Sequence, residues 1–257
     1  ALINFMAFLG WNPGYEMEIY SLPSLVKEFS LEKVQKGGAV FNIKRLDYLN
    51  GFYIRQKSIE KLTEMCVPYL IEAGLIEKTG ENPGNPGESE GTEKLEIFGK
   101  ETPEYKIKES GEGISFEKIT KIISIYQERL KKLSEIVELT DFFFKEKLDY
   151  NKELLKWDEM SDKEIKDSLD KLEKILLKIK SENWIKENLE DVLLPEAEKI
   201  GPAPQQVGYG VKDRGYLLWP FRVALTGKEA SAGPFEIAEI LGKEKTIKRI
   251  KEARKLL

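Results

Sequence analysis

The sequence contains no histidine, and this absence removes several classes of catalytic chemistry. Histidine is the commonest general base, the usual partner of a nucleophilic serine or cysteine, and the commonest metal ligand. Neither a Walker phosphate loop nor a GxGxxG fingerprint occurs. Carboxylates are abundant, but no pair stands in a setting that would separate their pKa values. We therefore predict no catalytic residue, no metal ligand and no cofactor site in this chain.

Cysteine and long apolar runs are equally scarce. The single cysteine, Cys66, excludes an internal disulfide and a cysteine-based zinc site. It lies in "EKLTEMCVPYL", where apolar residues recur at helical spacing, so we predict a core position. No run of roughly 18 apolar residues and no signal-peptide charge pattern occurs. We expect a cytoplasmic protein without membrane contact.

Acidic and basic residues are nearly balanced, with 45 acids, 41 bases and a net charge of -4 over 257 residues. Hydrophobic residues make up 41% and charged residues 33%, which is typical of a globular protein with a helix-rich, solvated surface. The balance argues against a generally cationic nucleic-acid binder. Any RNA contact would need local clustering of cations, and we expect no DNA partner.

The front of the chain alternates short helices with turns. We predict helices in "LINFMAFLG" and "SLPSLVKEFS", and a helix in "FNIKRLDYLNGFYIR" that breaks at Asn50-Gly51. Residues 58–74 predict a helix that Pro68 bends or ends. Residues 79–113 are rich in Gly, Pro and Glu, with nine acids against four lysines. They predict a mobile surface insertion with a short hairpin around "KLEIF".

From Ser115 onward the pattern is strongly helical, which predicts an all-helical bundle for the back half. "SFEKITKIISIYQERLKKLSEI" predicts one long helix, and the three phenylalanines of "LTDFFFKEKLDY" predict a packed corner. Ser161 and Glu164 predict a capping box. Residues 201–218 predict a loop. The predicted fold class is mainly α, with few short strands.

The stretch "WPFRVALTGKEASAGPFEI", residues 219–237, places Arg222 inside an apolar run. A Thr-Gly break follows, and Gly233-Pro234 predicts the start of another helix. A helix N-terminus offers unpaired N–H groups and partial positive charge. With Arg222 one short loop away, such a joint suits a nucleobase edge, a phosphate or a carboxylate. The alternative is that Arg222 pairs with a buried acid such as Glu236 and locks the joint.

Basic residues gather in the terminal segment, where Lys248, Arg249 and Lys251 are candidates for contacts to a phosphate backbone. The alternative is a solvated helix whose cations complement its own dipole. A smaller group, Lys44, Arg45 and Arg55, surrounds the predicted break at Gly51.

Three motifs together resemble the C-terminal half of bacterial-type glutamyl-tRNA synthetases, which are class I synthetases. They are "ALINFMAFLGWNPG", "AVFNIKRLDYLNGFYIR" and "PFRVALTGKEASAGPFEIAEILGKEKTIKRI", in matching order over almost all 257 residues. The departures are the insertion at 79–113 and the loop at 201–218. The HIGH-type and KMSKS-type motifs of the family's catalytic domain do not occur. The resemblance implies a piece of a longer ligase that does not charge tRNA by itself, with ATP and Mg belonging to the catalytic domain.

The resemblance also implies a division into domains, a partner and a set of contacts. Residues 1–57 would be a stem-contact domain, and residues 58–145 and 146–257 two helical anticodon-binding subdomains. The expected partner is tRNA(Glu), with tRNA(Gln) as a second candidate, and the expected state is a monomer. A helical scaffold for protein partners is the alternative function. The positions that match the family's anticodon contacts are Arg222, Ser231, Ala232, Gly233 and Pro234, together with Arg129 in "ERLKKL" for the third anticodon base.

Overall fold

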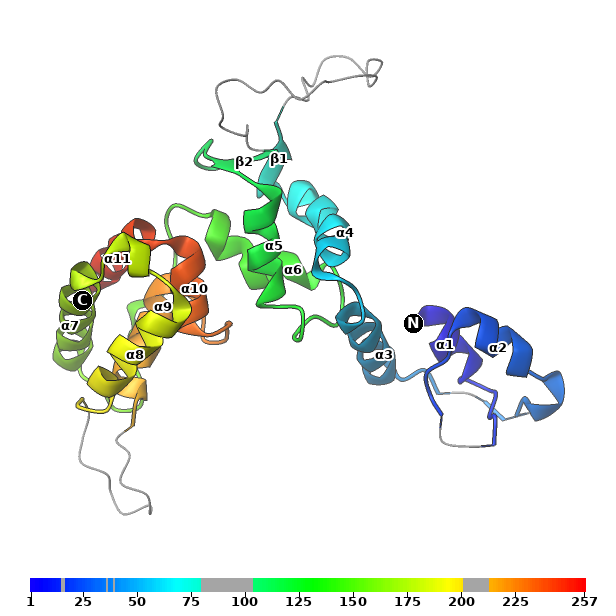
Figure 1. Ribbon diagram of the computed structural model, residues 1–257. Helices are drawn as coiled ribbons and strands as arrows, with labels where there is room; N and C mark the ends of the chain where they lie inside the picture. Colours follow the sequence, from blue (N-terminus) through cyan, green and yellow to red (C-terminus); the bar gives the residue numbers. More distant parts are fainter. Residues whose placement is uncertain (15–16, 36, 39, 80–103, 201–212) are drawn as a thin grey trace.

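The computed structural model describes residues 1–14, 17–35, 37–38, 40–79, 104–200 and 213–257. Helices dominate these residues, with one small antiparallel sheet, so the predicted mainly α class is confirmed. Figure 1 shows α1 and α2 at one end of the molecule, the sheet with α4–α6 in the middle, and α7–α11 at the other end. Among the described helices, none is both long and apolar enough to cross a membrane.

The N-terminal part holds α1 (Leu2–Ala7), α2 (Leu22–Glu28) and the short 3-10 helix η1 (Leu31–Lys33). The two predicted helices are therefore confirmed, and the Ser21 hydroxyl caps the second by accepting the N–H of Ser24. A separate small core lies here, made of Trp11, Tyr20 and Leu25.

Helix α3 (Ile43–Arg55) runs through Asn50 and Gly51 without interruption, so the predicted break there is wrong. A Cβ at Gly51 would lie 3.3 Å from the backbone oxygen of Leu130 and 3.0 Å from the guanidinium of Arg55. This glycine therefore serves a close approach between α3 and the segment around Leu130, in place of the predicted change of direction.

Helix α4 (Ile59–Glu72) likewise continues past Pro68, which neither ends nor limits it. Leu62, Cys66 and Leu70 form a fully buried stripe along the helix, and this packing holds it together across the proline. The predicted core position of Cys66 is confirmed, and burial raises the pKa of its thiol to about 12.

The sheet consists of β1 (Ile76–Lys78), β2 (Tyr105–Ile107) and β3 (Gly113–Ile114), antiparallel and in that order. Ile76 lies opposite Ile107, and both are buried together with Ile114. The last ten residues of the predicted insertion at 79–113 therefore supply β2, the turn after it and the first residue of β3, which corrects that prediction. The hairpin predicted around "KLEIF" lies outside the described residues.

The predicted long helix after Ser115 is divided. Helix α5 (Phe116–Ser124) ends early, turns follow, and α6 (Glu135–Thr140) leads into the 3-10 helix η2 (Asp141–Phe144). The turns bury Tyr126 and Leu130 completely, and the Glu135 carboxylate accepts the N–H groups of Lys131 and Lys132. Tertiary packing thus overrides local helical propensity. Phe142, Phe143 and Phe144 are all buried, as predicted.

The remaining elements form the C-terminal helical bundle. In chain order they are η3 (Lys152–Leu155), α7 (Asp162–Lys178), η4 (Ser181–Asn183), α8 (Lys186–Ala197), α9 (Gly215–Thr226), α10 (Pro234–Leu241) and α11 (Lys243–Arg254). Helix α9 is central, since it packs against α7, α8, α10 and α11. The predicted capping box of Ser161 and Glu164 is present. Helix α9 begins at Gly215, so the loop predicted to reach residue 218 is shorter at its C-terminal end.

Candidate nucleic-acid interface

The joint between α9 and α10 is built by two glycines and a proline. Helix α9 ends at Thr226 and is capped by Gly227, which adopts a left-handed conformation with φ of 66°. Helix α10 begins at Pro234, as predicted, and the Glu236 carboxylate accepts the N–H of Gly233 at 3.2 Å. Between them, Ser231 and Ala232 are buried. The joint therefore contacts neighbouring groups mainly through its backbone N–H and C=O groups.

Arg129 reaches this joint from a distant part of the sequence. Its Nη1 donates to the backbone oxygen of Ser231 at 2.7 Å, across 102 residues of chain. Arg129 is exposed and lies in the turns after α5, not in the helix that the sequence predicted. The structure thus brings Arg129, Ser231 and Arg222 together, although Arg129 was selected on a different motif from the other two.

Arg222 lies on α9 and is half-buried. Burial lowers the pKa of its guanidinium, and the positive charge of Arg129 lowers that pKa further. Among the described residues, Arg222 forms neither a side-chain hydrogen bond nor an ion pair. Glu236 instead pairs with Lys186 at 2.8 Å, so the alternative of an Arg222–Glu236 lock is wrong. A desolvated guanidinium without a carboxylate partner retains all of its donors for a ligand.

Tyr126, which lies within the segment predicted as one long helix, completes this site. Its side chain is 0% exposed, and its hydroxyl oxygen accepts the N–H of Ala232 at 3.3 Å. Burial raises the pKa of Tyr126 to about 12, against the effect of the Ala232 hydrogen bond and of the two arginines. The hydroxyl is therefore neutral at physiological pH. We call Tyr126, Arg129, Arg222, Ser231 and Ala232 the two-arginine site.

A second contact fixes the loop of this joint to the middle of the molecule. Lys228 forms an ion pair with Asp141 at 2.7 Å, and Asp141 also pairs with Lys145 at 2.5 Å. Burial opposes ionisation of Asp141, but the two lysines outweigh it and hold the pKa of Asp141 below its usual value. The sequence carries no local signal for this contact because its members lie 87 residues apart.

The basic residues of α11 do not form a free cationic surface. Arg249 is 1% exposed and donates to the backbone oxygens of Leu225, Phe142 and Lys145. It is therefore a core residue and not a phosphate contact, which corrects the sequence prediction. The reason is its place on the buried face of α11, which it shares with Thr246, Ile250 and Ala253. Lys248 and Lys251 are half-exposed, but each is paired with a glutamate, Glu146 at 2.8 Å and Glu173 at 3.4 Å.

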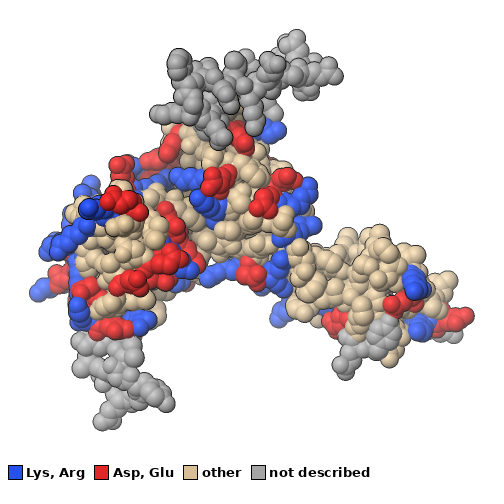
Figure 2. Space-filling model, viewed as in Figure 1, with Lys and Arg blue, Asp and Glu red and all other residues tan. Residues whose placement is uncertain are grey.

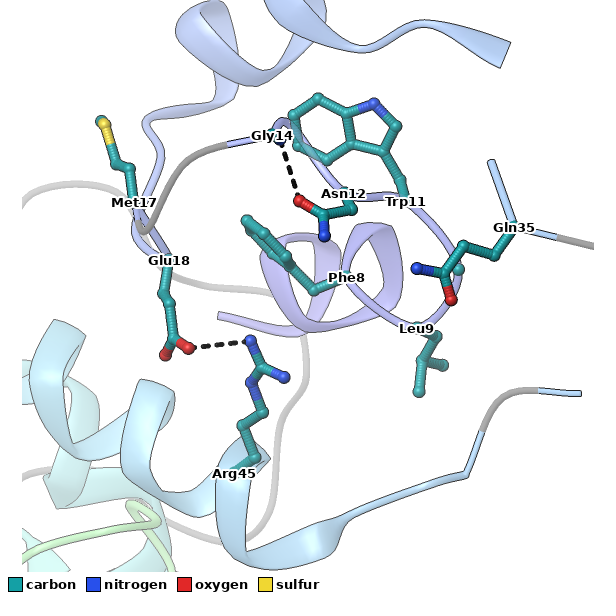
Figure 3. A pocket seen from close by; sticks show the side chains of 10 residues that line it. Phe8, Leu9, Trp11, Asn12, Gly14, Met17, Glu18, Gln35 and Arg45 are labelled. Carbon is teal, nitrogen blue, oxygen red and sulfur yellow. Dashed lines mark hydrogen bonds and ion pairs between the residues drawn. The ribbon is translucent and has the colours of Figure 1, made fainter. Parts of the chain in front are cut away.

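The smaller basic group lies on α3. Lys44 is exposed, and Arg55 lies 3.8 Å from Glu128. Arg45 lines a pocket of the N-terminal part together with Phe8, Trp11, Asn12 and Gln35, and Figure 3 shows its guanidinium directed at Glu18, 3.1 Å away. The charge of Arg45 is thus already compensated.

Helix α3 also contacts the turns that carry Arg129. The Gln127 amide donates to the backbone oxygens of Ile54 and Lys57, and Lys132 pairs with Asp47 at 3.4 Å. Figure 2 shows Lys and Arg interspersed with Asp and Glu over this middle part and over the C-terminal bundle. The face in view therefore carries mixed charge.

Comparison with known proteins shows the family to which this chain belongs. Residues 61–254 match the family described as the anticodon binding domain. Because this match covers well over half of the chain, the chain belongs to the anticodon binding domain family. The matched range includes every member of the two-arginine site.

Individual relatives agree with this assignment. The chain is 36% identical over 253 residues to glutamate–tRNA ligase 1 of Caldicellulosiruptor saccharolyticus and 34% identical over 253 residues to a glutamate–tRNA ligase of Clostridium botulinum. These alignments cover 97% and 98% of this chain but 42% of each relative. The resemblance to glutamyl-tRNA synthetases found in the sequence is thereby confirmed.

The fold has a counterpart among solved structures. It is similar to the crystal structure of a glutamate tRNA ligase from Elizabethkingia meningosepticum in complex with its amino acid, with a TM-score of 0.69 and 23% identity. The likeness covers 99% of this chain and 40% of that one. It extends over the N-terminal helices as well as the family match.

Proposed function

We propose that this chain binds tRNA(Glu) and reads its anticodon at the two-arginine site. The observation that carries the proposal is Arg222, a half-buried guanidinium without a protein partner among the described residues, inside an anticodon binding domain. Desolvating a cation without pairing it lowers stability. A ligand that supplies hydrogen-bond acceptors to Arg222 would offset that loss of stability in the complex.

The mechanism is recognition of single-stranded RNA. The bases of an anticodon loop unstack and can then be stacked on a guanidinium plane or hydrogen-bonded at their edges. Arg222 offers paired donors to a base edge, and Arg129 keeps the donors that Ser231 does not occupy. Each stacked or bonded base contributes on the order of 1–3 kcal/mol.

The residues of the α9–α10 joint divide this work. Because Ser231, Ala232 and Pro234 are buried, they would meet bases through their backbone or by shape, and Gly233 is the more open position. Arg129 is the candidate reader of the third anticodon base. In that role it would set the preference for tRNA(Glu) over tRNA(Gln).

Phosphate contacts would come from the basic residues that the fold leaves accessible. Lys44 is exposed, whereas Lys248, Lys251, Arg45 and Arg55 would have to exchange a carboxylate for a phosphate. Binding of this chain is therefore expected to be weak and to fall steeply as salt rises.

In the proposed whole protein, this chain is the tRNA-binding part of a glutamate–tRNA ligase, and ATP and Mg act in a catalytic part. The division at 57/58 and 145/146 belongs to the proposal. The separate core around Trp11 supports a distinct N-terminal part, while Ile54 near the end of α3 belongs to the main core. A cytoplasmic monomer belongs to it as well. The chain alone should give no ATP–pyrophosphate exchange with glutamate, and detectable exchange would refute that part of the proposal.

The direct test is a salt-titrated binding assay with two RNAs. Transcribed tRNA(Glu) and an unrelated hairpin RNA of equal length carry similar charge, so electrostatics alone binds them equally. We expect tighter binding of tRNA(Glu), with a difference that persists as salt rises. Equal affinities at every salt concentration would refute anticodon reading and would favour the alternative of a helical scaffold for protein partners.

A further inference from the structure

We propose that Tyr126 is a positioning residue for anticodon reading, whose hydroxyl holds the Ser231–Ala232 backbone so that Arg129 and Arg222 are presented together. This inference rests on the proposed function of the two-arginine site. Tyr126 acts through its neighbours, because its side chain is fully buried and offers no surface to an RNA.

Two hydrogen bonds join the same two short segments in opposite directions. The N–H of Ala232 donates to the Tyr126 hydroxyl at 3.3 Å, and the guanidinium of Arg129 donates to the Ser231 oxygen at 2.7 Å. The N–H of Arg129 also donates to the backbone oxygen of Tyr126 at 2.9 Å. These three bonds close a ring that fixes both ends of the Arg129 side chain.

The hydroxyl is the replaceable part of this ring. Ala232 is 1% exposed, so its N–H cannot turn to bulk solvent if the acceptor is removed. A buried donor without an acceptor costs more than the net value of the bond itself, so the loop is expected to shift. Phenylalanine would fill the same volume as Tyr126 and remove only this acceptor.

The position of Arg222 depends on the same ring. The two guanidinium groups carry like charge and influence each other, and among the described residues no carboxylate joins them. Their separation is therefore set by whatever holds Arg129 on the Ser231 oxygen. If the loop shifts, repulsion separates the arginines and the paired presentation is lost.

The test compares Tyr126→Phe with Tyr216→Phe. Tyr216 is also buried, but its hydrogen bond to α7 does not use its hydroxyl. The backbone oxygen of Tyr216 accepts that bond from the Ser168 hydroxyl. For each chain, Kd is measured for tRNA(Glu) and for the same tRNA with one anticodon base changed. The selectivity is the Kd for the altered tRNA divided by the Kd for tRNA(Glu). We expect this ratio to fall about five- to tenfold in Tyr126→Phe, the equivalent of one lost hydrogen bond, and to stay at the wild-type value in Tyr216→Phe.

If Tyr126 were merely structural, its replacement would lower the melting temperature of the chain and weaken binding of both RNAs equally. An unchanged ratio in Tyr126→Phe beside a clear wild-type ratio would therefore overturn this inference alone. A wild-type ratio of one would overturn the proposed function, and this inference with it. Amide hydrogen exchange gives an independent reading without RNA: the Ala232 amide should exchange faster in Tyr126→Phe, and unchanged protection would overturn the positioning role.

Discussion

At the scale of single residues, the two arginines of the interface have different surroundings. Arg129 is exposed and tied to the Ser231 oxygen, whereas Arg222 is half-buried and bonded to no described residue. A guanidinium that is already hydrogen-bonded is pre-organised and loses little conformational freedom on binding. A partly desolvated guanidinium without a hydrogen bond gains most free energy when a ligand supplies acceptors. We therefore expect Arg129 to contribute to selectivity and Arg222 to affinity.

Replacing Arg129 by glutamine tests the first expectation. Glutamine is neutral, carries fewer donors and cannot present the same planar fork, so the preference between tRNA(Glu) and tRNA(Gln) should narrow by about tenfold. Kd values for both tRNAs on the wild type and on Arg129→Gln measure this preference. An unchanged ratio would remove Arg129 from the site.

The sequence predicted the role of a single residue only where that role depends on its neighbours in the sequence. Pro234 at the start of α10 follows from the Gly-Pro signal, and Arg222 stands out inside its apolar run. The bond from Arg129 to Ser231 depends on tertiary packing, which no spacing records. Arg249 did leave a signal, since it shares a helical face with Thr246, Ile250 and Ala253, all buried. Its position in a basic run obscured that pattern.

At the scale of elements, the joint between α9 and α10 determines where the two-arginine site lies. Gly227 ends α9 in a left-handed conformation, and the pair of Lys228 with Asp141 fixes the loop to η2. Both contacts act on the backbone that leads to Ser231. Changes at either position should therefore lower stability and move the site.

Gly227→Ala tests the glycine. The left-handed conformation costs about 1 kcal/mol for a side chain, and the new Cβ would lie 3.0 Å from the Tyr150 ring, so we expect a total loss of about 2 kcal/mol in urea unfolding. Gly111→Ala is the matched control, because φ is 72° there but no atom lies within 4 Å of the new Cβ. Equal losses for the two variants would contradict the proposed contact with Tyr150.

Asp141 makes the stability of this joint depend on pH. Because its pKa is lowered in the folded chain, its contribution is present above the ordinary carboxyl range and is lost as the pH falls through the folded value. Asp141→Asn should therefore lower stability by about 1 kcal/mol at pH 7. The difference from wild type should disappear towards pH 2.

Urea unfolding at pH 7, 4 and 2.5 measures this dependence. Glu117→Gln is a useful control, since its pair with Lys121 lies on the exposed face of α5 and its loss should have no measurable effect. A difference between Asp141→Asn and wild type that stays constant across these pH values would show that the carboxylate charge does not stabilise the joint.

Element boundaries were the least predictable feature of the fold. The break expected at Gly51 is absent, and α4 does not end at Pro68, where a bend or an end was expected, because buried residues on both sides of each position hold the helix in place. The reverse occurred after Ser124, where a continuous helical pattern gives way to turns that bury Tyr126. In each case long-range contacts outweighed a local preference.

At the scale of the whole molecule, composition and periodicity predicted a helical protein, while the family resemblance rested on three sequence motifs. They did not predict the sheet of β1, β2 and β3, because its strands are short and its central strand lies in a segment with the composition of a loop. The charge pattern of α11 was also misleading, since the fold pairs its lysines with glutamates of other elements. Arg222, in contrast, forms no ion pair with any residue that the structure describes.

The most direct test of this account compares Arg222→Ala with Lys251→Ala in equilibrium binding to tRNA(Glu) at physiological salt. Removing Arg222 would delete the proposed base contacts, so Kd should rise about ten- to hundredfold. Removing Lys251, which is already paired with Glu173, should change Kd by less than about twofold. An equal loss in both variants, or a larger loss for Lys251→Ala, would contradict the claim that this chain reads an anticodon with Arg222.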